Sequence, residues 1–94
     1  MPEITTKELV EKIIDFVKEW WIKTYKDLYE KLVPNNLNED DEDKLKFKIR
    51  RVSRKLKDKW IIEFERWWKN FVYIGDDEQI DDKVIEEIDK NLFR

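Results

Sequence analysis

The most informative part of the sequence is residues 44–62, KLKFKIRRVSRKLKDKWII. Apolar side chains recur there at spacings of 4, 3, 4 and 4 residues, the period of one face of an α-helix. They are Leu45, Ile49, Val52, Leu56 and Trp60. This pattern predicts a helix over about residues 39–59 with that face buried. At about 100° per residue, the opposite side presents Phe47, Arg50, Arg51, Arg54, Lys57 and Asp58, with Lys46, Lys48, Lys55 and Lys59 on its flanks.

The same stretch concentrates positive charge. Residues 44–60 hold nine basic residues and one acid, Asp58, and carry +8, whereas the other 11 basic and 22 acidic residues carry −11. The chain of 94 residues has a formal charge of −3. A basic element on an acidic body attracts a polyanion locally and orients it. The alternative is that these charges only solvate an exposed helix face.

A first helix is predicted over about residues 6–19. Thr5 is its expected cap, and Leu9 and Ile13 lie on its apolar side. Three further apolar residues widen that side: Val10, Ile14 and Trp21. So wide an apolar arc predicts contacts on two sides, with the core and with either a C-terminal helix or a second subunit.

Cap signals also mark the next two helices. Residues 21–23 are expected to be extended, and Thr24 then caps a short helix that ends before Pro34. Asn38 is the expected cap of the basic helix, whose first turn holds five acids, residues 39–43. Carboxylates favour the positive end of a helix dipole, so these acids indicate a helix start rather than a metal site.

The C-terminal part of the chain predicts a hairpin and one more helix. Residues 60–68 and 71–74 are rich in β-branched and aromatic residues and are separated by Lys69-Asn70, where Asn70 tolerates a positive φ. Trp67 and Trp68 alternate faces in such a strand, so one is expected in the core and one exposed. Gly75 ends the second strand, and a helix is expected from Asp76. Its apolar side is Ile80, Val84, Ile85, Ile88 and Leu92.

This order of elements, with residues 51–62 leading from a basic helix into two strands, resembles the winged helix-turn-helix DNA-binding domain. The resemblance covers about residues 5–75 and implies a mainly α fold with a small β-hairpin wing, an α+β class. We expect residues 1–75 to form this domain and residues 76–94 to form a C-terminal helix that packs on the core or at a dimer interface. One departure is that the family often has glycine after the basic helix, where this chain has Lys59 and Trp60.

The resemblance implies a double-stranded DNA-binding protein, a transcriptional regulator, with helix 39–59 in the major groove and hairpin 60–74 as the wing. Arg50, Arg51 and Arg54 are expected to read a base or hold phosphates, because a guanidinium matches guanine O6 and N7. Phe47 either packs on a thymine methyl or contacts another part of the fold or a subunit. The other expected DNA contacts are Lys46, Lys48, Lys55 and Lys57, then Thr24, Tyr25 and Lys26 at the start of the second helix, and Arg66, Lys69 and Asn70 at the wing tip.

The same residues are also compatible with other functions. A winged helix can instead be a protein–protein interaction module, or a replication or genome-organising factor. The +8 segment favours DNA, because a pure adaptor has no need of it. Many proteins of this kind bind palindromic sites as dimers. A homodimer is therefore an alternative, through the flank of the first helix and the C-terminal helix.

The composition argues against several classes. The absence of Cys and His removes disulfides, thiol nucleophiles, imidazole bases and the metal sites built on them. We therefore expect no cofactor, no metal and no enzymatic activity. The longest apolar run is residues 71–74, far below the roughly 20 that span a bilayer, and no signal-peptide pattern is present. We expect a cytoplasmic protein, nucleoid-associated or in a host cell if viral. Its abundant Lys, Glu, Ile and Trp resemble hyperthermophile proteins and small archaeal virus or plasmid proteins.

Overall fold

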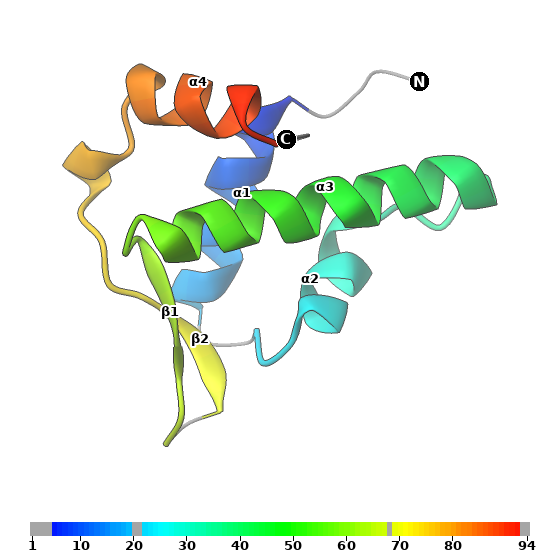
Figure 1. The fold of residues 1–94 in the computed structure, drawn as a ribbon. Coiled ribbons are helices and arrows are strands. Elements are labelled where there is room, and N and C mark those ends of the chain that lie inside the picture. Colours follow the sequence, from blue (N-terminus) through cyan, green and yellow to red (C-terminus); the bar gives the residue numbers. More distant parts are fainter. Residues whose placement is uncertain (1–4, 20–21, 68, 93–94) are drawn as a thin grey trace.

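The computed structural model describes residues 5–19, 22–67 and 69–92 (Figure 1). In chain order the elements are α1 Thr6–Lys18, α2 Tyr25–Leu32, α3 Glu39–Asp58, β1 Ile62–Glu65, β2 Asn70–Tyr73, the short 3-10 helix η1 Asp77–Gln79, and α4 Asp82–Lys90. The fold is mainly helical with one antiparallel hairpin, which confirms the predicted α+β class. The predictions for Trp21 and Trp68 lie outside the described residues.

The predicted caps start the first three helices. The Thr5 side chain accepts a hydrogen bond from the backbone N–H of Glu8 (3.1 Å), and Asn38 accepts one from Asp41 (2.8 Å). Thr24 and Asp27 form a reciprocal capping box at the start of α2. Each cap satisfies N–H groups that a helix leaves without intrahelical partners. Local sequence therefore fixes where α1, α2 and α3 begin.

One hydrophobic core holds the helices together. In Figure 1, α3 crosses in front of α1, with α4 along one flank and α2 along the other. Ile49, Val52 and Leu56 of α3 are fully buried, as predicted, and so are Ile88 of α4 and Leu92, which follows α4. Burying such a side chain stabilises the fold by about 1.5–3 kcal/mol. The C-terminal helix therefore belongs to the same core as residues before 75.

The apolar flank of the first helix is buried by other elements of the same chain. Val10 is 0% and Ile14 4% exposed, because α1 also packs against α4 and β2. Of the two alternatives predicted for this flank, the C-terminal helix is therefore the one that Val10 and Ile14 pack against. The last helix also starts later than predicted, at Asp82, because the Asp81 side chain accepts a hydrogen bond from the N–H of Val84 (2.9 Å) and caps it there.

The C-terminal end of α3 corrects the prediction for Trp60. The backbone N–H of Ile61 bonds to Leu56 O and that of Trp60 bonds to Lys57 O, the paired bonds of a Schellman motif. This motif needs a left-handed residue, and Trp60 has φ 62°. The reversal takes Trp60 out of the buried stripe and leaves it 70% exposed. It also sends the chain into β1.

The hairpin is shorter than predicted and has a longer turn. Ile62 pairs with Tyr73 and Glu65 with Asn70, so the turn lies between Glu65 and Asn70. The positive φ of 53° falls on Lys69 and not on Asn70, which is the first residue of β2. The segment expected to be a strand at 21–23 has no strand in its described residues. Ile22 O nevertheless accepts a hydrogen bond from Phe71 N–H (2.8 Å), which ties it to β2.

Among the described residues, none of the helices has the length and apolar character needed to cross a membrane.

Candidate nucleic-acid interface

The predicted basic face of α3 forms a solvent-facing ridge. Arg50, Arg54 and Lys57 are exposed, Arg51 is partly exposed, and Phe47 is 46% exposed among them. The ridge lies opposite Ile49, Val52 and Leu56, which anchor α3 in the core. The structure therefore brings these five predicted site residues together on one side of one helix.

Two of these arginines lie beside aromatic rings and not beside carboxylates of the described residues. The Arg51 guanidinium carbon lies 4.7 Å from the centre of the Phe47 ring, and that of Arg50 lies 5.9 Å from the centre of the Tyr25 ring. Within the described part of the chain, neither guanidinium nor that of Arg54 forms an ion pair. Cation–π contacts orient a guanidinium while leaving its charge in place. The ridge therefore keeps its positive potential.

Two lysines beside the ridge form ion pairs within the protein. On the α2 side, Lys46 Nζ lies 2.9 Å from Glu42 Oε1 and 5.8 Å from the centre of the Tyr29 ring. The hydrogen bond to Glu42 raises the pKa of Lys46. On the α4 side, Lys59 pairs with Glu87 at 3.0 Å. Of the lysines predicted to contact DNA, Lys46 is thus engaged within the protein.

Two more predicted contacts, Lys48 and Lys55, are half-buried. Lys48 borders a hollow between the start of α1 and α4, beside Thr6 and Asp89. The Thr6 hydroxyl donates a hydrogen bond to Asp89 Oδ1 (2.5 Å) in that hollow, which joins α1 to α4. Lys48 therefore lies on the flank of the ridge, whereas Lys57 is exposed on the ridge itself.

The start of α2 lies beside the ridge. Thr24 and Lys26 are exposed, and the Thr24 hydroxyl is used as the cap. Tyr25 is half-buried between Arg50 and Phe71 of β2, whose ring centre is 5.5 Å from its own. Burial raises the pKa of the Tyr25 phenol, while the charges of Arg54 and Arg50 act in the opposite direction. Tyr25 therefore links the ridge to the hairpin.

The hairpin turn presents two of its three predicted contacts. Arg66 and Lys69 are exposed, whereas Asn70 is 3% exposed and its Oδ1 has no hydrogen-bond partner among the described residues. Because pairing with Glu65 places Asn70 inside β2, its side chain is not presented at the tip as expected. Trp67 in the turn is 92% exposed.

Sequence reasoning missed the exposure of Trp60. The only signal was that Trp stands where a helix end of this kind favours glycine. Phe64, 37% exposed, was likewise not singled out; its ring packs edge-on against Phe71, with centres 5.4 Å apart.

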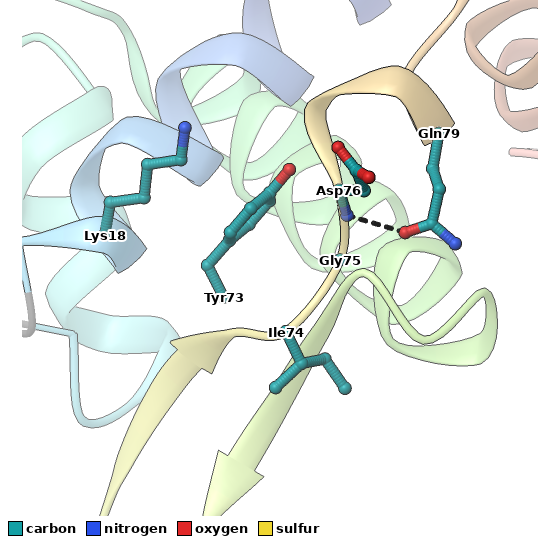
Figure 2. Close-up of a pocket in the computed structure, with 6 residues that line it drawn as sticks. All are labelled: Lys18, Tyr73, Ile74, Gly75, Asp76 and Gln79. Carbon is teal, nitrogen blue, oxygen red and sulfur yellow. Dashed lines mark hydrogen bonds between the residues drawn. The ribbon is translucent and has the colours of Figure 1, made fainter.

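A separate hollow lies at the junction of α1, β2 and η1. It measures about 550 Å³ and its lining includes Lys18, Tyr73 and Gln79 (Figure 2). Lys18 Nζ lies 4.7 Å from the centre of the Tyr73 ring, and Gln79 accepts a hydrogen bond from the N–H of Asp76. None of the described residues that line it belongs to α3. In the described residues, no group of three or more carboxylates is placed to hold a metal ion.

Comparisons with known proteins add no relative: the chain has no significant match to a protein-family model, a curated protein or a solved structure.

Proposed function

We propose that this protein binds double-stranded DNA in the manner of a winged helix, with α3 in the major groove and the β1–β2 hairpin as the wing, and that it regulates transcription. The observation that carries the proposal is the ridge. Arg50, Arg51 and Arg54 face solvent on one side of α3 and make no ion pair with the described residues. A major groove about 12 Å wide admits an α-helix, and guanidinium groups bind both phosphates and guanine edges.

The charge along α3 determines which part of the helix enters the groove. Its first turn carries Glu39, Asp40, Asp41 and Glu42, and this end of α3 extends beyond α2 in Figure 1. Phosphates repel these carboxylates, so the acidic end stays outside the duplex. The groove then receives residues 47–57, about 15 Å of helix. The C-terminal end of α3 leads into the hairpin. The helix and the wing therefore approach the same duplex.

A protein-interaction module is the second candidate, because two large aromatic side chains are exposed outside the ridge. Trp60 is 70% and Trp67 92% exposed. Exposed tryptophan is typical of interface anchors. The two functions differ in their response to salt, because a tryptophan anchor is largely insensitive to it whereas phosphate contacts release counterions.

Fluorescence anisotropy with a labelled random-sequence duplex tests the proposal. If about five phosphates are neutralised, log K falls with log salt at a slope of about −4 to −5. Arg54→Ala is expected to weaken binding by about 1–3 kcal/mol and to relax base preference if Arg54 reads a base, or to weaken it equally on all sequences if it holds a phosphate. Absence of binding at low salt, or a flat salt response, would contradict the proposal.

A further inference from the structure

We propose that Phe47 and Arg51 act as one reader of two adjacent base pairs, a thymine next to a guanine. This inference rests on the proposed DNA binding and names the sequence feature that the ridge would recognise. It starts from a large aromatic side chain, 46% exposed, in the middle of a basic face. An aromatic ring does not attract phosphate. In the major groove it can instead pack against the thymine methyl, the apolar group that the base pairs present there.

The spacing of the two side chains limits what they can reach. They are one helical turn apart at i and i+4, and the guanidinium carbon lies 4.7 Å from the ring centre. Successive base pairs are about 3.4 Å apart along the duplex. Two groups that are separated by less than twice this rise contact the same base pair or two neighbouring base pairs. A thymine methyl and the O6 and N7 atoms of guanine belong to different base pairs, so the two pairs are adjacent.

The contact also prepares the arginine for this role. Arg51 is only partly exposed and forms no ion pair within the described residues. Packing on Phe47 limits its rotamers before binding, and ordering a long side chain is one of the costs of association. The Arg54 guanidinium, by contrast, makes no cation–π contact with a ring of the described residues. Its charge acts on Tyr25 only by lowering the pKa of the phenol. Of the two, Arg51 is the better prepared to read a base.

The acidic first turn supports this placement. Phe47 lies about one turn beyond the acids at 39–43, at the point where the charge of α3 changes sign. It is therefore the first aromatic side chain of α3, in the part of the helix that phosphates attract. We place the thymine–guanine step at the edge of the contacted site nearest the N-terminal end of α3.

The test first selects bound fragments from random duplexes, then measures affinity with single atoms of the selected site changed. Replacing the critical thymine by deoxyuridine removes only the methyl group and is expected to weaken wild-type binding about fourfold. Replacing the neighbouring guanine by 7-deazaguanine is expected to weaken it about fivefold. In Phe47→Ala the deoxyuridine penalty disappears, and in Arg51→Lys the 7-deazaguanine penalty shrinks. Trp67→Ala, which removes an exposed aromatic outside the ridge, keeps both penalties.

The outcomes separate the inference from the proposed function. Salt-dependent duplex binding with no deoxyuridine penalty at any thymine overturns the inference and leaves DNA binding intact. A penalty that persists in Phe47→Ala assigns the methyl contact to another residue and also overturns it. Failure to bind any duplex at low salt overturns both. The deoxyuridine measurement uses the wild-type protein, so it stands even if a variant unfolds.

Discussion

Replacing Trp60 by Gly should give a more stable protein than replacing it by Ala. Both substitutions remove the same exposed ring, so they differ only in how well the new residue tolerates φ 62°. A left-handed conformation costs a non-glycine residue about 1–2 kcal/mol. Glycine loses about 0.5–1 kcal/mol more backbone entropy than Ala on folding. The free energy of unfolding of Trp60→Gly should therefore exceed that of Trp60→Ala by about 0.5–1 kcal/mol.

The assay is reversible thermal unfolding followed by circular dichroism. For a chain of this size the advantage corresponds to a difference in Tm of about 2–8 °C. The matched control is Lys12→Gly against Lys12→Ala, at an exposed position inside α1. At that position the Ala variant should be more stable than the Gly variant by about 1 kcal/mol, because the backbone is helical. If Trp60→Ala is as stable as Trp60→Gly while the control behaves as expected, the left-handed end of α3 is refuted.

Three further predictions follow from local geometry. Gly75→Ala should destabilise the fold by about 1–3 kcal/mol in urea unfolding, because the new Cβ would lie 3.0 Å from the backbone Cα of Ile61; wild-type stability would refute that packing. Leu56→Ala should cost about 2–5 kcal/mol by the same assay, since Leu56 is fully buried; a cost below 1 kcal/mol would contradict its place in the core. The ultraviolet titration step that Tyr25→Phe removes should lie above pH 10, because burial raises that pKa. The corresponding share of stability is present below pH 10 and is lost as pH rises through the raised pKa; a step at or below pH 10 would contradict the burial.

The sequence predicted the parts of the fold that depend on local rules. Helix caps at Thr5, Thr24 and Asn38 require only a side-chain oxygen and the N–H groups that follow it, so they were readable. The buried stripe of Ile49, Val52 and Leu56 was predictable because, within a continuous helix, apolar residues at helical spacing mark the buried face. Trp60 was misplaced because the Schellman turn ends that periodicity one residue before it. Nothing in the spacing of apolar residues marks the reversal.

Features that depend on tertiary pairing were not predictable in the same way. The hairpin register places Asn70 inside β2 because Phe71 bonds to Ile22 O and packs on Tyr25, both far away in sequence. The burial of Val10 and Ile14 depends on where α4 and β2 dock on α1. For the candidate site, the helical wheel gave the ridge of arginines. It did not show that Lys46 lies beside the Tyr29 ring, because that contact depends on α2 covering one flank of α3. The ion pair of Lys46 with Glu42 is instead a local i,i+4 contact of α3 itself.

The most direct test of DNA binding compares the salt dependence of two triple variants with equal charge. Arg51, Arg54 and Lys57 lie on the ridge, whereas Lys7, Lys12 and Lys83 are exposed on α1 and α4. With all three ridge residues changed to Ala, the slope of log K against log salt should become shallower by about 2–3 units, close to 0.9 per lost phosphate contact. The α1 and α4 variant should keep the wild-type slope. Equal slopes in the two variants would contradict the account, because the ridge would then contribute no more than any other three charges.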